Sequence, residues 1–412
     1  MTSRVILKRS LLVSVCLLIL TSTALGKVIY VDADATGAND GSTWADAYRF
    51  LQDALANARS ETKPVEIWVA QGVYTPDSNA AEPNGTGDRE ATFQLMDNVA
   101  MYGGFPPGGG SWGERDPNLY ESTLSGDLDG NDVAVSDPCD LVDHPNRGEN
   151  SYHVVTADGT SKTAILDGFT ITAGNANGSG SHKTGAGMLN TVGNPTVHNC
   201  TFTSNSAVAN GGGIYNSSKG NPALSDCLFM ENSANNGGGM YNWEASSTLL
   251  ECIFSGNSAR ADGGAMGIRN GGSGVFVGCK FSGNSAQNGG AIYCYTNCDA
   301  NLVNCTFSGN SALVRGGAMY NIHGCRPTLT ECTLTANTAR LEGGGMYNYW
   351  CDSLLAKCCT FTENAAYDGG GMCTYDTSAE VSACTLSANS AENKGGGPVL
   401  SYRVLGWPRT SD

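Results

Sequence analysis

Apolar and polar positions recur along the C-terminal part of this 412-residue chain with a period of 25 to 27 residues. Each copy has a cysteine, an apolar residue two positions later, an asparagine five positions after the cysteine, and then a Gly-Gly pair. The alternation in Cys-x-Phe predicts short β-strands, and the glycine pairs predict sharp corners. The eight repeated cysteines are Cys200, Cys227, Cys252, Cys279, Cys305, Cys332, Cys359 and Cys384.

A repeat of this length predicts one turn of a parallel β-solenoid, because it is too short for the helical pairs of TPR or HEAT repeats. Neighbouring turns of a β-solenoid lie about 4.8 Å apart, so equivalent residues stack directly above one another. We therefore expect interior rows of Cys, Phe, Ala and Met. The repeated asparagines, from Asn205 to Asn389, are expected to form a ladder of hydrogen-bonded amides.

The repeat also resembles known proteins. Phe-x-x-Asn followed by Gly-Gly-Ala/Gly-Met/Ile resembles the repeat of chlamydial polymorphic outer membrane proteins, in a setting similar to secreted β-helices of the pectin-lyase-like superfamily. The resemblance covers residues 168–397, with six Phe-x-x-Asn copies and two Leu-x-x-Asn variants. It implies an all-β fold, a single right-handed parallel β-helix of roughly twelve coils.

The ends of the chain depart from the repeat. Residues 1–26 have a basic start, an apolar core and a small-residue end, which predict a cleaved secretory signal. Residues 27–167 are expected to form an N-terminal cap and irregular coils with insertions, including a capping helix over residues 44–58. Residues 168–397 are the regular coils, and residues 398–412 are a tail outside the repeat. The mature chain has no second apolar stretch that could span a membrane.

Composition and charge narrow the choice of partner. Of the 55 glycines, 21 lie in the eight glycine runs, so the glycine excess marks the corners of the coils. The 23 Lys and Arg residues against 39 Asp and Glu residues leave a net charge of −16, which repels nucleic acids. Together with the signal, these features predict a protein that is secreted or at the cell surface. Its expected partner is a polysaccharide or a cell-surface molecule.

An acidic segment ahead of the repeats is the candidate metal site. Asp127, Asp129, Asn131 and Asp132 place oxygen ligands around a glycine, as calcium loops do, although the glutamate that closes such a loop is missing. The segment predicts either a calcium site or a solvated acidic loop. Calcium is the one cofactor that we expect.

Catalysis has only weak candidates in the sequence. A calcium-dependent polysaccharide lyase of the pectate type needs an Arg or Lys base near carboxylate-bound calcium. Asp143 and Arg147 are the weak candidates for such a site, within the N-terminal insertions. The repeats carry mostly Thr, Ser and Asn on their strand faces and no recurring carboxylate pair.

Two further rows run through the repeats. One contains Tyr215, Tyr241, Tyr293, Tyr320 and Tyr347, and it predicts either packing between turns or a platform on which sugar rings stack. The other contains Cys298, Cys325 and Cys351, in the loop before the next strand. Most of the repeated cysteines should be buried thiols, but one disulfide could form within this loop row.

These observations favour an exported β-helix protein with a structural, adhesive or carbohydrate-binding role and no clear catalytic site. The lyase is the alternative.

Overall fold

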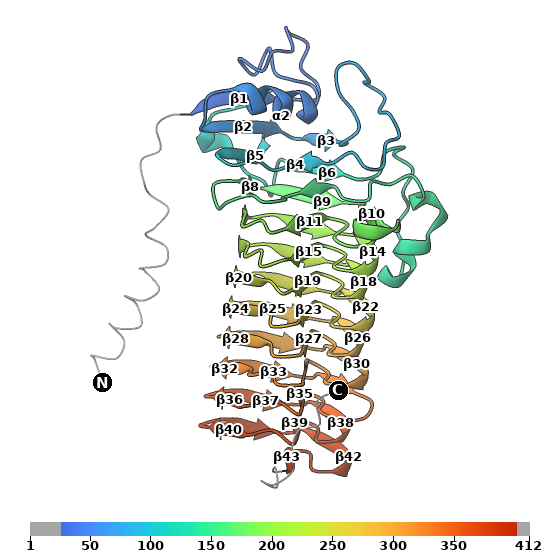
Figure 1. Cartoon of the computed structure of the whole chain (residues 1–412), viewed down its shortest axis with the longest axis vertical. Helices are drawn as coiled ribbons and strands as arrows, with labels where there is room; N and C mark the ends of the chain where they lie inside the picture. Colours follow the sequence, from blue (N-terminus) through green and yellow to red (C-terminus); the bar gives the residue numbers. More distant parts are fainter. Residues whose placement is uncertain (1–25, 402–412) are drawn as a thin grey trace, which may run out of the picture.

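The computed structural model describes residues 26–401. These residues form one long parallel β-helix, whose turns stack along a single axis (Figure 1). The strands align in four parallel sheets of 12, 11, 11 and 9 strands, which we name A, B, C and D. The predicted all-β, right-handed parallel β-helix is confirmed.

Sheet A contains β1 (Lys27–Val31), β2 (Val65–Ala70), β5 (Val99–Phe105), β8 (Ile165–Asp167), β12 (Thr196–His198), β16 (Ala223–Ser225), β20 (Ser246–Leu250), β24 (Ser273–Val277), β28 (Asp299–Val303), β32 (Thr328–Thr330), β36 (Leu354–Lys357) and β40 (Ala379–Ser382). Sheet B contains β3 (Gly72–Tyr74), β6 (Ser122–Ser125), β9 (Phe169–Thr172), β13 (Thr201–Thr203), β17 (Leu228–Met230), β21 (Ile253–Ser255), β25 (Lys280–Ser282), β29 (Thr306–Ser308), β33 (Thr333–Thr335), β37 (Thr360–Thr362) and β41 (Thr385–Ser387).

Sheet C contains β4 (Phe93–Gln94), β7 (Val155–Thr156), β11 (Met188–Thr191), β15 (Ile214–Ser217), β19 (Met240–Trp243), β23 (Met266–Arg269), β27 (Ile292–Tyr295), β31 (Met319–Ile322), β35 (Met346–Tyr349), β39 (Met372–Tyr375) and β43 (Pro398–Ser401). Sheet D contains β10 (Asn175–Ala176), β14 (Ser206–Asn210), β18 (Ser233–Asn236), β22 (Ser258–Asp262), β26 (Ser285–Asn288), β30 (Ser311–Arg315), β34 (Thr338–Ala339), β38 (Ala365–Asp368) and β42 (Ser390–Lys394). The helices are α2 (Leu51–Ser60) and the short 3-10 helices η1 (Trp112–Glu114), η2 (Pro138–Asp143), η3 (Pro145–Arg147) and η4 (Gly180–Lys183).

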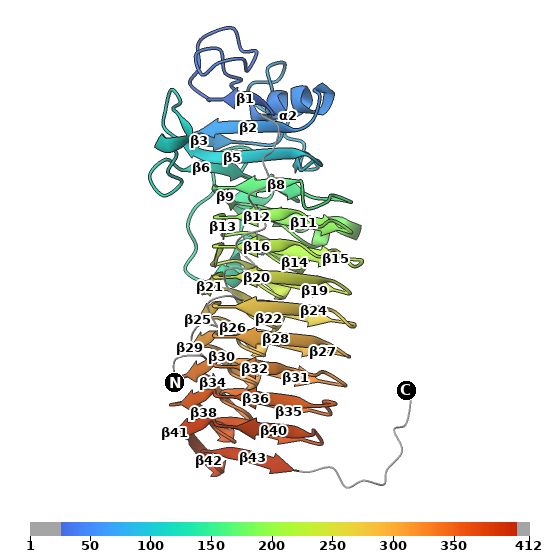
Figure 2. The same cartoon turned by 90° about the vertical axis from the view of Figure 1, so that its left-hand side faces the viewer.

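The roughly twelve predicted coils correspond to turns that differ in how many of the four sheets they contribute a strand to. Nine turns, from β8 to β43, contribute one strand to every sheet, in the order A, B, D, C. Two earlier turns lack a strand in sheet D, and β1 adds a single strand above them. The long loops belong to these early levels, whereas the connections between the nine regular turns are short (Figure 2).

The predicted asparagine ladder is confirmed and runs unbroken from Asn205 to Asn389. In each rung the side-chain Nδ2 donates to the Oδ1 of the asparagine in the next turn, at 2.9 to 3.1 Å. The same Nδ2 also donates to a backbone carbonyl, as from Asn284 to Phe254 O at 3.0 Å. The ladder therefore pairs polar groups that would otherwise be buried without partners.

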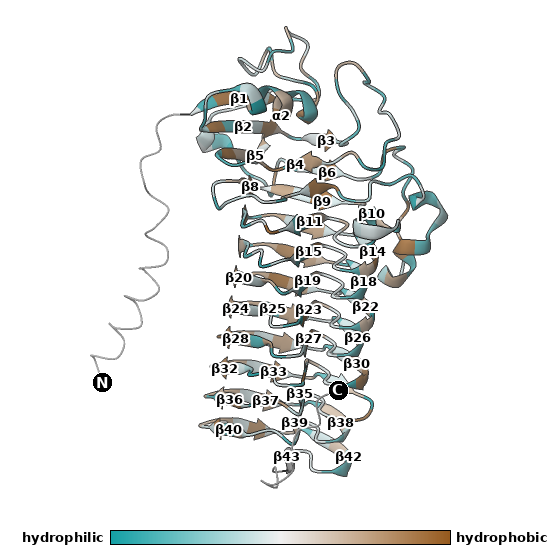
Figure 3. Cartoon of the chain, viewed as in Figure 1, coloured by the Kyte–Doolittle hydropathy of each residue, from teal (hydrophilic) through white to brown (hydrophobic). Residues whose placement is uncertain are grey.

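The apolar rows fill the interior as the repeat predicts. Phe202, Phe229, Phe254, Phe281 and Phe307 are buried, and their ring centroids lie 4.5 to 5.1 Å apart with nearly parallel planes. The cysteines two residues ahead of them are free thiols, mostly buried. The strands are accordingly largely apolar or neutral in colour in Figure 3, while polar colours gather at loops and turns.

The glycine corner between sheets D and C has a steric cause. A Cβ at Gly290 would lie 2.2 Å from the backbone oxygen of Gly317 in the next turn. No side chain fits at this separation, so the corner must be glycine where turns stack this closely.

The N-terminal helix caps the solenoid but begins later than predicted. The helix α2 packs on β1, β2 and β4 and buries Leu51, Ala54, Leu55 and Ala58 at the end of the core. Residues 44–50, expected to be helical, form turns, because Tyr48 N donates to Tyr30 O at 2.9 Å and Tyr48 O accepts from Asp32 N. This pairing with the edge strand β1 replaces the hydrogen bonds of a first helical turn.

The other predicted boundaries differ by a few residues. The first complete turn begins at Ile165, close to the predicted start at 168, and β43 extends the repeat to Ser401, into the expected tail. The predicted signal, apart from its last residue, and residues 402–412 lie outside the described residues. No helix within residues 26–401 is long and apolar enough to cross a membrane.

Candidate functional site

The insertion between β6 and β7 folds back along the solenoid and covers the corner of sheets B and D. Its helix η2 packs on β14, β18 and β22, as seen beside these strands in Figure 1. Leu141 and Val142, which belong to η2, are buried. Arg260 of β22 holds the outer side, because its Nη2 donates to Cys139 O at 3.0 Å and to Asp143 Oδ2 at 2.6 Å.

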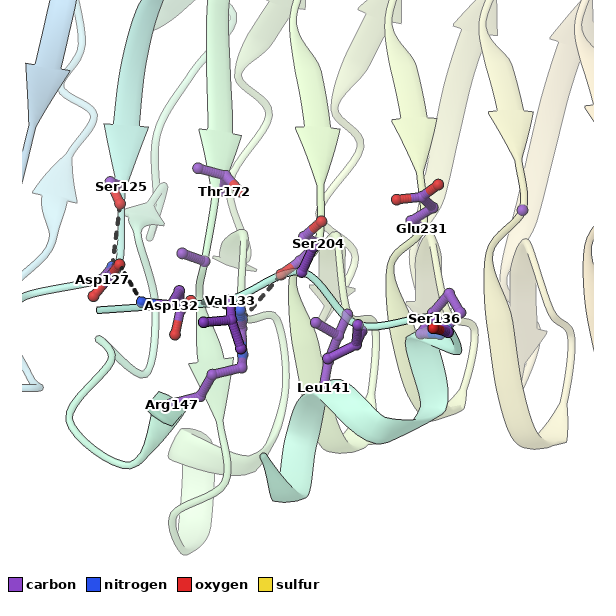
Figure 4. Close-up of a pocket in the computed structure, with 15 residues that line it drawn as sticks. Ser125, Asp127, Asp132, Val133, Ser136, Leu141, Arg147, Thr172, Ser204 and Glu231 are labelled. Atoms are coloured by element: carbon purple, nitrogen blue, oxygen red, sulfur yellow. Dashed lines mark hydrogen bonds and ion pairs between the residues drawn. The ribbon is translucent and has the colours of Figure 1, made fainter. Parts of the chain in front are cut away.

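A pocket of about 440 Å³ lies between this insertion and the solenoid wall (Figure 4). On the solenoid side it is lined by residues that follow successive strands of sheet B, among them Ala173, Ser204 and Glu231. Each of these three has a positive φ, between 53° and 63°, because it forms the tight turn from sheet B to sheet D. On the insertion side, the pocket is lined by Asp127, Asp132 and Arg147 among others.

Arg147 anchors the insertion to the solenoid. Its Nη1 donates to Asp132 Oδ2 at 2.7 Å, and its Nη2 donates to Gly174 O at 3.0 Å and Ser204 O at 2.9 Å. Only 2 % of Arg147 is exposed, and burial lowers the pKa of its guanidinium. Because Asp132 and two carbonyls hold the guanidinium, this arginine is a structural clamp rather than a free base.

Three carboxylates meet at the same place. One oxygen each from Asp127, Asp132 and Glu149 lies within 4.8 Å of the others. Asp127 also shapes the loop, because its two oxygens accept from the backbone nitrogens of Asn131 and Asp132 at 3.1 and 3.0 Å. Burial raises the pKa of Asp132, against the opposing effect of Arg147. The donor set of carboxylate oxygens is the one that Ca²⁺ prefers.

This cluster differs from the metal site expected from the sequence. Asp127 and Asp132 are brought together, whereas Asp129 is exposed and does not belong to the cluster, and Asn131 is exposed and contacts Asp127 through its backbone nitrogen. Glu149 takes part although the sequence reasoning missed it. It lies 17 residues after Asp132 in the chain, and only the closure of the insertion brings the two side by side.

The two weak catalytic candidates, Asp143 and Arg147, each form an ion pair with a different residue. Asp143 is exposed and paired with Arg260, whereas Arg147 is buried and paired with Asp132. Neither pair leaves a free base beside a carboxylate.

The predicted tyrosine row lies on the outward side of sheet C but below the surface. Tyr241, Tyr293, Tyr320 and Tyr347 are buried, and Tyr215 is half-buried. Burial raises the pKa of Tyr320 to about 12. A ring must expose its surface to contact a sugar. Of the two roles expected for this row, burial therefore favours packing between turns over an open platform.

Charged residues cover this row. Arg269 lies over the rings of Tyr293 and Tyr295, with its guanidinium carbon 5.2 and 5.1 Å from their centroids. The same arginine donates to Asp262 Oδ2 at 2.7 Å, across the corner between sheets C and D. Arg315 lies over Tyr347 in the same way and pairs with Glu342.

A second row with several aromatic residues lies two residues further along the strands of sheet C. We call it the outer aromatic row. Its positions stack in register through sheet C, each paired with the equivalent residue of the next turn. These positions are Trp243, Arg269, Tyr295, Ile322, Tyr349 and Tyr375. The residue types alternate too much for the sequence alone to reveal a row.

The outer aromatic row is exposed near the C-terminal end of the solenoid. Tyr375 is 52 % exposed, and Trp350, which follows Tyr349, is 47 % exposed. The ring of Tyr349 stacks on both, with centroids 5.5 Å from Tyr375 and 4.7 Å from Trp350. His323 packs against Trp350 at 5.4 Å. The C-terminal end of sheet C thus presents an exposed aromatic cluster of Tyr349, Trp350 and Tyr375.

The cysteines of the shorter row are free thiols. Cys298, Cys325 and Cys351 are buried, and the Cys298 thiol donates to Tyr295 O at 3.1 Å. Hydrogen bonding to Cys325 and burial raise the pKa of Cys298, whereas the same contact lowers the pKa of Cys325. Cys298 and Cys325 are therefore neighbours, and a disulfide in this row stays a prediction.

The chain has only distant likeness to the solved structures named next. No curated protein matches the chain. Among solved structures, a rhamnogalacturonan lyase is 9 % identical over 94 % of this chain and 90 % of that chain, with a TM-score of 0.37. The catalytic unit of a thermostable GH87 alpha-1,3-glucanase from Streptomyces thermodiastaticus is 14 % identical over 95 % of this chain and 72 % of that chain, with a TM-score of 0.36.

The family model described as right handed beta helix region matches residues 184–361 and 265–403. The two matches overlap and together cover more than half of the chain. The chain belongs to the right-handed β-helix family.

Proposed function

We propose that this protein is exported and acts outside the cell as a scaffold that binds polysaccharide along sheet C. The outer aromatic row is the observation that carries this proposal. Its exposed end, formed by Tyr349 and Tyr375 together with the adjoining Trp350, offers aromatic surface and phenolic hydroxyls together. Such side chains favour ligands that are partly apolar and partly hydrogen-bonding, as sugar rings are.

The surroundings of the row support an extended ligand. The ion pairs Arg269–Asp262 and Arg315–Glu342 lie beside the rings and supply further donors and acceptors. Since turns are about 4.8 Å apart, positions of this row recur along the axis at a spacing similar to that of sugar units in a chain, although the residue type differs between turns. The net charge of −16 favours a neutral polysaccharide over an acidic one.

A direct test is affinity electrophoresis of the mature chain in gels that contain soluble neutral polysaccharides. We expect retardation by at least one of them, and about tenfold weaker binding in Trp350→Ala and Tyr375→Ala. Tyr367→Ala is the matched control, because Tyr367 is 45 % exposed but belongs to β38 of sheet D. The proposal is overturned if no polysaccharide retards the protein, or if the control weakens binding as much as the two variants.

The alternative function is a calcium-dependent polysaccharide lyase. The pocket lined by Asp127 and Asp132 is the place where its substrate would bind. The hydrogen bonds that hold Arg147 weigh against it, because a base must be free to take a proton. Incubation with polygalacturonate and Ca²⁺ separates the two functions. A lyase releases unsaturated products that absorb in the ultraviolet, and the binding scaffold releases none.

Export rests on residues 1–26 and has its own test. We expect the expressed protein outside the cytoplasm, with an N-terminus at Lys27 after cleavage. An uncleaved chain in the cytoplasm of its own host would contradict this part of the proposal.

A further inference from the structure

We propose that Asp127, Asp132, Glu149 and Asn150 bind one divalent cation, of which Ca²⁺ is the best fit, and that this cation fastens the insertion to the solenoid. The site lies at the corner of sheets B and D and is independent of the polysaccharide surface on sheet C.

The spacing of the carboxylates fits a single ion. Ca²⁺ binds oxygens at 2.3 to 2.6 Å, so two ligands of one ion lie no more than about 5 Å apart. One oxygen from each of Asp127, Asp132 and Glu149 satisfies this limit, since they lie within 4.8 Å of one another. Hard carboxylate oxygens without thiol or imidazole favour Ca²⁺ over transition metals.

Unpaired buried oxygens give an independent reason. Asn150 is fully buried, and its Nδ2 donates to Asp132 Oδ2 at 2.9 Å and to Ala173 O at 2.7 Å. These two bonds fix the amide against the cluster and leave its Oδ1 without a donor. Asp132 Oδ1 and Glu149 Oε1 are also buried without a hydrogen-bond partner. Acceptor oxygens gathered in this way favour a cation, because no donor of the described residues reaches them.

The charges around the cluster also favour a bound cation. Arg147 brings one positive charge against three carboxylates, and Arg89, whose Nε donates to Asn150 O at 2.6 Å and which interacts with the charge of Glu149, brings a second, so negative charge still exceeds positive charge here. Arg147 contacts only the Oδ2 side of Asp132, and the Oδ1 side stays open to a second cation. A divalent ion would offset this remaining negative charge at a partly buried place, where unbalanced charge is most costly.

The position of the ligands defines the role of the ion. Asp127 lies at the start of the insertion, directly after β6, and Glu149 lies near its end. An ion between them closes the insertion into a loop, and Asn150 ties the closed loop to the turn after β9. Closing a long loop removes conformational freedom, so the ion should order the segment that covers the pocket.

Calorimetric titration of CaCl₂ into the chelator-treated mature chain tests the site. We expect one ion per chain with a Kd below about 1 mM, weaker binding of MgCl₂, and a rise in Tm with Ca²⁺. Ca²⁺ should also slow the cleavage of the insertion in limited proteolysis. Glu149→Gln keeps the shape of the side chain and should weaken Ca²⁺ binding at least about tenfold.

Asp129→Asn is the matched control, because Asp129 is an exposed carboxylate of the same insertion outside the cluster. We expect it to bind Ca²⁺ as the wild type does. The inference is overturned if the wild type binds no Ca²⁺ below about 10 mM, or if Asp129→Asn weakens binding as much as Glu149→Gln. Glu149→Gln leaves the Arg147–Asp132 pair intact, so its unfolding transition without Ca²⁺ should match that of the chelated wild type.

Discussion

Replacing one rung of the asparagine ladder should measure how much the ladder stabilises the solenoid. Asn284 is fully buried at the middle of the ladder. Its Oδ1 accepts from the backbone nitrogen and the Nδ2 of Asn257, both at 3.0 Å. Its Nδ2 donates to Phe254 O at 3.0 Å and to Asn310 Oδ1 at 2.9 Å. Asn284→Ala therefore removes four hydrogen bonds in a single substitution.

The cost follows from what the substitution leaves behind. Two donors of Asn257 lose their acceptor in a place that water reaches poorly, and each unpaired buried donor costs about 1 to 3 kcal/mol. The alanine also leaves a small cavity, whose loss of contacts adds to this cost. We expect Asn284→Ala to lower the free energy of unfolding by about 2 to 5 kcal/mol.

Urea denaturation followed by circular dichroism gives this free energy, and hydrogen exchange shows whether the loss concentrates in the turns around the rung. Asn393→Ala is the control, because Asn393 is exposed and makes one bond, to Asp368 Oδ1. It should change stability by less than about 0.5 kcal/mol. If Asn284→Ala costs no more than this control, the ladder does not stabilise the solenoid and the reasoning fails.

Three other predictions follow from single positions. Gly290→Ala should lower the free energy of unfolding by about 3 kcal/mol or more, because its Cβ would meet a backbone oxygen at 2.2 Å. Gly309→Ala should lower it by about 1 kcal/mol, since only the φ of 62° at this position opposes an alanine. Thermal unfolding of the two variants compares these costs. Ellman's reagent should modify Cys358 first in the native chain, as it is the one exposed cysteine among residues 26–401, and Cys358→Ser should remove this fast reaction. Burial lowers the pKa of His153 to about 4, below its unfolded value near 6.5, so the unfolded state takes up the proton first as pH falls. Stability present above pH 6.5 should then be lost toward pH 4, by about 3 kcal/mol, and denaturation of His153→Gln across this range should show a smaller loss.

The periodic part of the fold could be read from the sequence because its cause is local and repeated. Each copy carries the same Cys, Phe and Asn at fixed spacing, and stacking turns each position into a row. The capping helix was placed too early because the apolar spacing from Trp44 ignored a competing partner. Tyr48 pairs with the backbone of β1 instead, and no helical periodicity contains that information.

The candidate sites were harder to predict, for physical reasons that differ between them. At the metal cluster, Glu149 joins Asp132 only after the insertion folds onto the solenoid, so no local motif contains both residues. On sheet C, the regular tyrosine row is covered by side chains from the corner with sheet D. The exposed surface belongs to Tyr349, Trp350 and Tyr375, whose positions vary in residue type from turn to turn. On sheet C, positions with the same residue type in most turns are therefore packed, and positions whose residue type varies are more exposed.

Sheet D has a property that matters for engineering. Its strands differ in length from turn to turn, and the register shifts by a residue in several pairs, for example between β14 and β18 and between β18 and β22. The ladder asparagines before it and the glycine corner after it nevertheless stay aligned. Sheet D absorbs one of the two residues that separate turns of 25 and 27 residues as a bulge, and the segment between the glycine corner and the next repeated cysteine absorbs the other. It is accordingly the side of the molecule where a short foreign peptide could be grafted without disturbing the stacked rows of the other three sheets.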